Sequence, residues 1–186
     1  MASLRGQQYI VLRPTVAVAA FYESEQSKLL TRLPGSTPHP NTGHVTLRGL
    51  YEPDRVHVVR DLIESWADAM TPIDLIVDAI DGFPPPFAVL IARLARTKSL
   101  TEAYSSLTEL LDATDVRRIG ELPLDDWVFH LSIAYASALD EQEWHDVLAA
   151  SARAVTSSPR ERVSSVDFVW YDDDGEHIDS FALRSS

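Results

Sequence analysis

Apolar and polar residues follow one another along the chain in patterns that separate strands from helices. Runs rich in β-branched and aromatic residues predict strands, and apolar residues spaced three and four apart predict helices. Gly, Pro and Asp residues of the kind that form turns stand between these segments. The expected strands cover residues 7–13, 44–50, 73–83, 87–95, 126–136 and the two arms of 162–184 on either side of the turn 172–176. The expected helices cover residues 15–33, 52–70, 99–114 and 140–155.

Residues at three of the expected helix starts have the chemistry of helix caps or first turns. Thr15 is a candidate N-cap for the first helix, and Ser99 with Glu102 has the spacing of a capping box for the third. Pro53 fits the first turn of the second helix, where a missing backbone N–H costs nothing. We therefore expect these helices to begin at or close to these residues.

The order of the elements repeats along the 186 residues. Strand, helix, strand, helix, strand and strand fill the first part, and helix, strand, helix, strand and strand fill the second. This repetition predicts an α+β fold, a duplicated unit with mostly antiparallel sheets, in which each copy contributes one histidine-bearing strand to a central cleft. The length fits a single domain over residues 1–186, built as two lobes.

The two central strands carry the same short pattern of histidine, aliphatic, hydroxyl and aliphatic residues. It reads HVTL at 44–47 and HLSI at 130–133. Because side chains alternate along a strand, His44 and Thr46 are expected on one face, and His130 and Ser132 likewise. Each motif would then place an imidazole and a hydroxyl about 7 Å apart along the strand. Two such strands side by side would form a cleft with two imidazoles and two hydroxyls.

This set of groups suits proton transfer at a phosphate ester better than it suits metal binding. One imidazole can take a proton from the attacking oxygen and the other can give a proton to the leaving oxygen, since the ordinary pKa of histidine, about 6.5, serves both steps. Hydroxyls can hold the non-bridging phosphate oxygens. The chain has no cysteine, and neither motif supplies a carboxylate or a third histidine, so a zinc site fits poorly. The pattern indicates hydrolysis or transfer at a phosphodiester with no metal or other cofactor.

These motifs resemble the paired H-x-[ST]-x motifs of the two-histidine (2H) phosphoesterase superfamily, and the chain most resembles its 2',5' RNA ligase-like branch. GFPPPFAVLIARL at 82–94 and VDFVWYDDDGEHIDSFAL at 166–183 are similar to that branch as well, so the resemblance covers nearly the whole chain. It implies two pseudo-symmetric lobes around a cleft and metal-independent cleavage or formation of 2',3'-cyclic or 2',5' phosphodiester linkages.

The resemblance also assigns roles to the motif residues. It implies that His44 and His130 are the catalytic acid and base, in an order that the sequence leaves open, and that Thr46 and Ser132 bind the phosphate. The chain departs from the branch at Phe129, where proline is frequent, and at Ala134 and Tyr135, where many members have arginine. These departures count against activity on RNA ends more than against phosphodiesterase chemistry.

Three further side chains are candidates for the cleft. Alternation puts Arg48 on the face of His44 and Thr46, where it would reach a phosphate unless it turns to solvent at the strand end. Tyr135 is out of phase with His130 and would line the cleft only if the strand bulges or ends at Ala134, and would otherwise pack in the core. Phe83 either stacks on a base or plugs an apolar gap. The remaining histidines are expected to be solvated bystanders: His39, His57, His145 and His177.

The charge balance limits the partners. With 28 acidic and 16 basic residues the formal net charge is −12, so a long nucleic acid is not expected to bind. A nucleotide or a short RNA end with a cyclic phosphate or 2',5' linkage is still compatible, because net charge does not decide what one pocket holds. No run of about 18 apolar residues occurs, and we expect a cytoplasmic monomer that does not bind membranes. The alternatives to a hydrolase are a nucleotide-binding module without catalysis and an RNA 2',5' ligase or end-processing enzyme.

Overall fold

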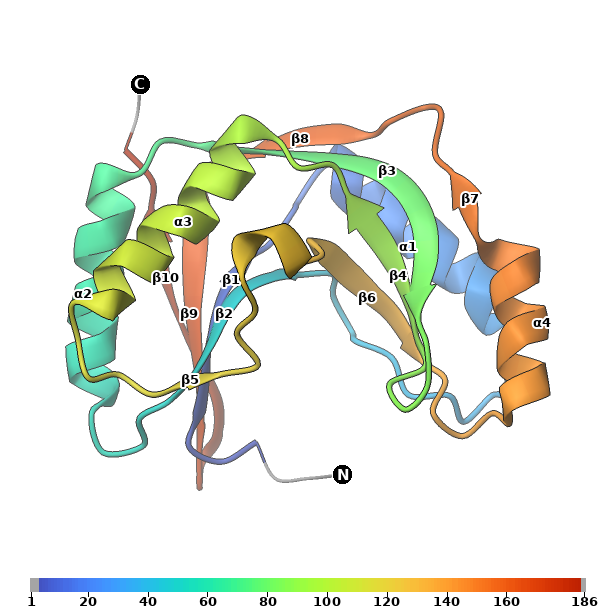
Figure 1. Ribbon diagram of the computed structural model, residues 1–186, viewed down its shortest axis with the longest axis horizontal. Coiled ribbons are helices and arrows are strands. Elements are labelled where there is room, and N and C mark those ends of the chain that lie inside the picture. Colours follow the sequence, from blue (N-terminus) through green and yellow to red (C-terminus); the bar gives the residue numbers. More distant parts are fainter. Residues whose placement is uncertain (1–3, 185–186) are drawn as a thin grey trace.

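Helices and antiparallel strands build the molecule, which a computed structural model describes over residues 4–184 (Figure 1). The strands are β1 (Gln7–Leu12), β2 (Val45–Tyr51), β3 (Ile73–Phe83), β4 (Val89–Leu94), β5 (Arg118–Ile119), β6 (His130–Tyr135), β7 (Arg153–Ala154), β8 (Arg160–Val163), β9 (Ser165–Asp172) and β10 (Gly175–Ala182). The helices are α1 (Ala17–Leu30), α2 (Val56–Ala69), α3 (Lys98–Asp112) and α4 (Glu141–Ser151), with a short 3-10 turn η1 (Leu124–Asp126). The predicted α+β class is confirmed. None of the helices within residues 4–184 has the length and apolar character needed to cross a membrane.

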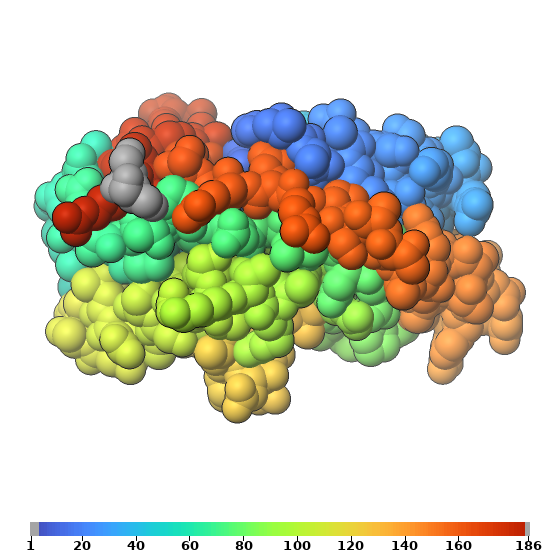
Figure 2. All heavy atoms as spheres, turned by 90° about the horizontal axis from the view of Figure 1, so that it is seen from above, coloured from blue at the N-terminus to red at the C-terminus, as the bar shows by residue number. Residues whose placement is uncertain are grey.

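The strands form one curved sheet in the order β10-β9-β1-β2-β6-β4-β3-β7, with β5 added to β2 and β8 added to β3. Every pairing among the described strands is antiparallel. The sheet bends into an arch, with α2 and α4 at opposite ends outside it (Figure 1). Seen from above, atoms of α1, α3 and the segment around β8 cover much of the outer surface (Figure 2). The concave side of the arch is therefore the face that the helices leave open.

The two histidine strands are neighbours at the centre of this sheet, as the sequence predicts. Val45 of β2 lies opposite Leu131 of β6. The two halves of the sheet nevertheless mix both parts of the chain: β1, next to β2, pairs with the C-terminal β9, which pairs with β10, whereas β4 pairs with β6 and β3 pairs with β7 and β8. The helices cross over as well, because α1 packs on β6 and α3 packs on β2. The order of elements predicts the repeat but does not reveal this exchange.

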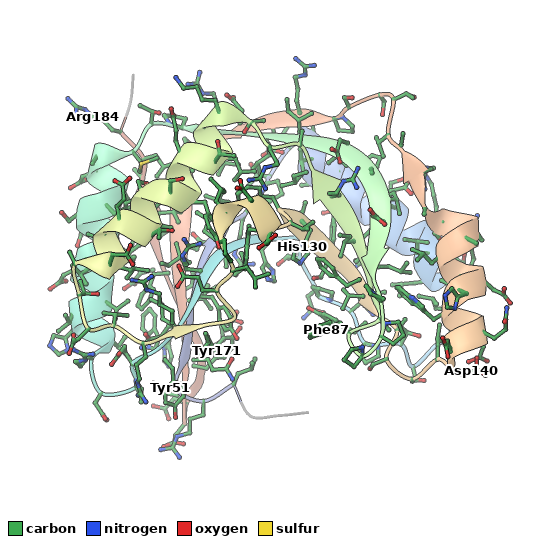
Figure 3. The ribbon with its side chains drawn as sticks, viewed as in Figure 1. Tyr51, Phe87, His130, Asp140, Tyr171 and Arg184 are labelled. Carbon is green, nitrogen blue, oxygen red and sulfur yellow. The ribbon has the colours of Figure 1, made fainter. Side chains whose placement is uncertain are left out.

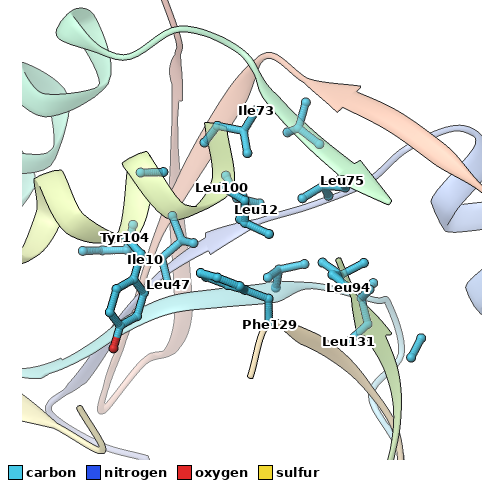
Figure 4. Packing of buried hydrophobic residues seen from close by; sticks show 14 of the residues in the cluster. Ile10, Leu12, Leu47, Ile73, Leu75, Leu94, Leu100, Tyr104, Phe129 and Leu131 are labelled. Carbon is cyan, nitrogen blue, oxygen red and sulfur yellow. The ribbon is translucent and has the colours of Figure 1, made fainter. Parts of the chain in front are cut away.

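The core lies between the outer face of the sheet and the helices. Leu12 of β1 and Leu47 of β2 are completely buried there, together with Leu100 and Tyr104 of α3 (Figure 4). Phe129, just before β6, packs edge-on against Tyr104 with ring centroids 5.7 Å apart. Burying one such aliphatic or aromatic side chain contributes about 1.5–3 kcal/mol. Since this face of the central strands is fixed in the core, their other face must turn toward the concave side.

The helix starts differ from the sequence prediction. Thr15 is not an N-cap: α1 begins at Ala17 after Val16, and the carboxylate of Glu161 in β8 accepts the backbone N–H groups there. In α3 the N-cap is Thr97, whose hydroxyl accepts the N–H of Leu100, so the predicted Ser99 capping box is wrong. At the start of α1 the cap is the carboxylate of Glu161, which comes from a distant strand. Such a carboxylate can cap a helix as well as a neighbouring residue can, and the local sequence pattern does not reveal it.

Two element boundaries also move. α2 begins at Val56, after Pro53 instead of around it. The histidine strand β6 begins at His130 and not at residue 126, because residues 124–126 form η1. His130 is therefore the first residue of its strand, just as His44 comes immediately before β2.

Candidate active site

His44 lines a cavity on the concave side of the sheet. Its ring is partly buried and makes a hydrogen bond with the backbone of Thr42. Burial lowers the pKa of His44 below its ordinary value, and the positive charge of Arg13 lowers it further. The neutral imidazole, which can accept a proton, is therefore favoured at neutral pH.

His130 sits in a similar environment on the neighbouring strand, at the top of the concave face (Figure 3). Its Nδ1 lies 2.7 Å from the carbonyl oxygen of Val128, so Nδ1 donates and Nε2 is left to act on a ligand. The Phe83 ring stands edge-on to the imidazole, with centroids 4.9 Å apart. Burial lowers the pKa of His130 as well. Phe83 therefore packs on a candidate catalytic ring, and this accounts for the aromatic residue at that turn.

Both motif strands contain a bulge at the same place in the motif. In β2, Thr46 lies opposite Val11 and Arg48 lies opposite the next residue, Ile10, so Leu47 is an extra residue. In β6, Ser132 and Ala134 lie opposite adjacent residues of β4, so the extra residue is Ile133. A bulge reverses the alternation beyond it. Thr46 and Ser132 come before the bulges and keep the face of their histidines, whereas the residues after them change sides.

The prediction that Arg48 shares the face of His44 is wrong, and the bulge at Leu47 is the reason. Arg48 is 1% exposed, and its guanidinium carbon lies 3.4 Å from the centroid of the Tyr104 ring in α3. The guanidinium also donates to the Tyr104 carbonyl oxygen at 3.1 Å and to the hydroxyl of Thr108. Arg48 thus joins β2 to α3 on the outer face, and it is not among the residues that line the cavity.

The second bulge has the opposite effect on Tyr135, which it turns into the cavity. The sequence predicts Tyr135 in the cleft only if the strand bulges or ends at Ala134, and the bulge is present. Two side chains of α1 hold the bulged segment, since the Tyr22 hydroxyl donates to the Ser132 carbonyl oxygen and Gln26 Nε2 donates to that of Ile133, both at 3.0 Å. Gln26 also donates to the carbonyl oxygen of Pro40, 3.0 Å away, which ties the loop over the cavity to the same helix.

The cavity has a volume of about 440 Å³ and brings most of the predicted site residues together. It is lined by His44, Thr46, Ser132 and Tyr135, and also by Leu4, Tyr9, Val11, Arg13, Pro40, Asn41, Thr42, Val169, Tyr171 and Glu176. His130 is not one of the lining residues. Its charge nonetheless lowers the pKa of His44, so the two imidazoles are close enough to interact. One imidazole and two hydroxyls thus line a space of nucleotide size, and the second imidazole lies close to the first.

Comparison with models of protein families shows the family of this chain. The family model of the 2'-5' RNA ligase superfamily matches residues 24–175, which include both histidine motifs. The chain belongs to the 2'-5' RNA ligase superfamily. A comparison with curated proteins finds no match.

Solved structures share the fold of this 2'-5' RNA ligase superfamily chain at low sequence identity. TT0787 of Thermus thermophilus is 17% identical with a TM-score of 0.72, and the match covers 97% of this chain and 99% of that one. E. coli LigT complexed with 3'-AMP is 12% identical with a TM-score of 0.60, covering 96% and 98%. The MHV ns2 PDE domain is 15% identical with a TM-score of 0.50, covering 86% and 98%. At these identities the likeness establishes the fold alone.

Arg13 also lines the cavity, although the sequence pattern did not single it out. It follows β1, whose last residue pairs with Val45, so Arg13 lies beside His44. Its Nε donates to Asp167 at 2.7 Å, and its Nη1 donates to the hydroxyl of Thr42 at 3.0 Å. These two contacts fix a guanidinium in the cavity wall and leave other N–H donors for a ligand. Only the antiparallel register of β1 and β2 reveals this placement.

Two tyrosines from strands near the ends of the chain line the part of the cavity formed by β1 and β9. Tyr9 of β1 lies opposite Val169 of β9, and Tyr171 lies opposite Glu176 of β10. The Tyr9 and Tyr171 rings meet edge-on at 6.3 Å between centroids. Because β1 and β9 are separated by about 160 residues, no local motif joins them.

The other histidines fall outside this cavity. His39, His57 and His145 are exposed, as expected. His177 is the exception, because it stacks on Trp170 at 5.1 Å between ring centroids and lies 2.8 Å from a carboxylate oxygen of Asp172. Within residues 4–184, no group of three or more His, Asp or Glu side chains could hold a metal ion.

Proposed function

We propose that this protein is a metal-independent phosphodiesterase that acts on the 2',3'-cyclic phosphate or 2',5' phosphodiester linkage of a nucleotide or a short RNA end. The observation that carries the proposal is the paired geometry of the motifs. In each motif a half-buried imidazole is followed two residues later by a hydroxyl and then by a bulge; His44 and both hydroxyls line one cavity, and His130 is close enough to His44 to lower its pKa. A structural histidine needs no such partner, whereas general acid–base catalysis requires two proton-transfer groups.

In the proposed reaction on a cyclic phosphate, a water oxygen forms a bond to phosphorus as the bond to one ribose oxygen breaks. One imidazole, neutral because burial lowers its pKa, accepts the proton that the water loses. The other imidazole, in its protonated form, gives a proton to the ribose oxygen that leaves. The product is a nucleoside 2'- or 3'-phosphate, and exchange of one proton with solvent restores the pair. Either of His44 and His130 can take either role.

The remaining polar groups of the cavity suit the phosphate. The Thr46 and Ser132 hydroxyls can donate to its non-bridging oxygens, where charge increases in the transition state. Arg13 supplies a fixed positive charge beside His44. These contacts involve one phosphate group, so the proposal does not depend on a long polyanion binding to a chain with a net charge of −12.

The comparisons support a nucleotide as the ligand. E. coli LigT has been solved with 3'-AMP, with ATP and with NADP⁺, and the viral neighbour is described as a PDE domain. We carry the nucleotide preference to this chain as part of the proposal, together with a cavity volume of about 440 Å³. Ligation, for which the superfamily is named, is the reverse of cleavage of a 2',5' phosphodiester and would use the same two histidines.

The proposal is tested by hydrolysis of the four nucleoside 2',3'-cyclic monophosphates in excess EDTA, with His44→Ala and His130→Ala variants beside the natural protein. We expect turnover that survives chelation and a loss of about 10²- to 10⁴-fold in each variant, the usual contribution of one acid or base. His57→Ala, an exposed histidine of α2, is the matched control and should keep full activity. The product isomer, read by ³¹P NMR, identifies the oxygen that leaves.

Two results would contradict the proposal. Equal turnover by the natural protein and both alanine variants would remove the histidines from the chemistry. Binding of nucleotides without turnover of any cyclic nucleotide, 2',5'-linked dinucleotide or cyclic-phosphate RNA end would instead indicate the non-catalytic binding module.

A further inference from the structure

Glu176 stands out among the groups that line the cavity, because a carboxylate is a poor neighbour for a phosphate. It lies on β10 at the end of the cavity formed by β1 and β9. It is the acidic side chain among the lining residues, and its charge partly offsets the lowering of the His44 pKa. The acid–base chemistry proposed above does not use it. Its position in the cavity therefore suits a part of the ligand other than the phosphate.

The carboxylate is held in place by Tyr171. The Tyr171 hydroxyl donates to Glu176 Oε2 at 2.5 Å. Burial and this carboxylate both raise the pKa of Tyr171, so the phenol keeps its proton and stays the donor. One carboxylate oxygen is thus engaged, while Oε1 and the remaining lone pairs of Oε2 can still accept hydrogen bonds. Because the side chain is positioned before any ligand arrives, it can discriminate between ligands by geometry.

The surroundings of Glu176 suit a flat, largely apolar group. Tyr9 and Val169 lie between this carboxylate and the residues next to His44, and Leu4 adds an aliphatic side chain that is 44% exposed. Gly49 faces Tyr9 across the strand pair, and a Cβ at Gly49 would come within 3.3 Å of the Tyr9 ring. Together with Ile119, whose side chain would lie 2.9 Å from that Cβ, the ring occupies the room that a larger residue would take. Aromatic and aliphatic walls of this kind bind nucleobases by stacking.

The base that satisfies a carboxylate best is guanine. Its Watson–Crick edge presents two adjacent donors, N1–H and the N2 amino group, which match the two oxygens of a carboxylate. Adenine and cytosine each present an amino group beside a ring nitrogen that accepts, and uracil presents one N–H between two carbonyls. For these bases an acceptor would face the negative charge of Glu176. The same carboxylate thus favours guanine and disfavours the other three bases.

We propose that Tyr9, Val169, Tyr171 and Glu176 form a base subsite that makes the protein selective for guanine nucleotides. The inference rests on the proposed function for its orientation, with the phosphate between His44, Thr46 and Ser132 and the base toward β10. Glu176 acts here as a specificity residue, and Tyr171 positions it.

The test compares guanosine and adenosine 2',3'-cyclic monophosphates as substrates, and guanosine and adenosine 3'-monophosphates as ligands in calorimetry. For the natural protein we expect a guanine preference of about 10- to 100-fold in kcat/KM and in Kd, the usual range for one good bidentate pair. Glu176→Gln should lower kcat/KM for the guanine substrate and raise it for the adenine substrate, because the charge that faces the adenine ring nitrogen is gone. Damage to the fold would lower both values. Tyr171→Phe should keep part of the preference.

Asp174→Asn, in the turn before β10 and outside the cavity, is the matched control and should leave the preference unchanged. Equal kcat/KM values and equal dissociation constants for the two bases would overturn the base subsite while leaving the phosphodiesterase proposal standing. A guanine preference in calorimetry that Glu176→Gln removes, without turnover of any substrate, would support the subsite and contradict the proposed hydrolysis. The two failures are therefore distinguishable.

Discussion

The protonation of the two motif histidines is set by their immediate surroundings. His44 and His130 are both deprived of water, and a positive charge near His44 adds to the effect. Each ring bonds to a backbone group two residues earlier, Thr42 or Val128, which orients it. The neutral rings are therefore favoured until a phosphate brings negative charge into the cavity, and that charge would raise both pKa values.

This arrangement makes a prediction about the free protein. NMR titration of the ring protons should give midpoints for His44 and His130 below about 6.5, the ordinary histidine pKa. Since a lowered folded-state pKa means that the unfolded chain binds the proton more readily, these two rings should cost stability as the pH falls through about 6.5 toward the folded value. Midpoints above about 6.5 would contradict the burial argument.

Secondary-structure elements place these residues, and the two bulges are the decisive local features. The bulge in β2 sends Arg48 into the core, and that in β6 sends Tyr135 into the cavity. Helix α1 donates to two carbonyl groups at the second bulge, through Tyr22 to Ser132 and through Gln26 to Ile133, and Gln26 also donates to the carbonyl of Pro40. The helix thus fixes both the strand and the loop of residues 34–43 beside the cavity.

Gln26→Leu tests this role of α1. The substitution keeps the size of the side chain but removes its hydrogen bonds to the carbonyls of Ile133 and Pro40. Leaving buried carbonyls unpaired should lower the free energy of unfolding by about 1–3 kcal/mol, measured by urea denaturation. We expect KM to rise more than kcat falls, because Tyr135 and the loop lose their support. Gln142→Leu, on the exposed side of α4, is the control. A stability and KM equal to those of the control variant would refute the role.

Much of the element pattern could be predicted from the sequence, because period-two and period-3.6 spacings are local. The strand β3 was predicted with its observed bounds, residues 73–83. The register between strands is not local, so Arg48 was assigned to the wrong face and Tyr135 could only be assigned conditionally. Arg13 and Glu176 were missed for the same reason: each comes to line the same cavity as His44 only through pairings between β1, β2, β9 and β10.

The whole molecule combines a strongly acidic surface with a site for one phosphate. The net charge of −12 opposes the approach of a long polyanion, while Arg13, Thr46 and Ser132 offer local contacts to a single group. These contacts line one cavity, and His130 and Tyr171 lie on the concave side of the curved sheet (Figure 3). The substrate should therefore be recognised as a small molecule or a chain end.

Salt dependence tests this size limit. We compare a cyclic mononucleotide with a short RNA oligomer that ends in a 2',3'-cyclic phosphate, at rising KCl concentrations. If only one or two phosphates are contacted, log KM should rise with log salt with a slope of about 1 for both, and the oligomer should bind no more than about threefold better. A steep slope and a much lower KM for the oligomer would show that the protein tracks the RNA backbone.

The most direct test of two-histidine catalysis is the pH dependence of kcat/KM for a cyclic nucleotide in excess EDTA. Activity should fall at low pH because the base becomes protonated, and at high pH because the acid loses its proton. Since burial lowers the pKa of both His44 and His130 in the free protein, we predict a bell with its maximum below about pH 6.5. A profile that is flat across this range, or that keeps rising into alkaline pH, would contradict the account.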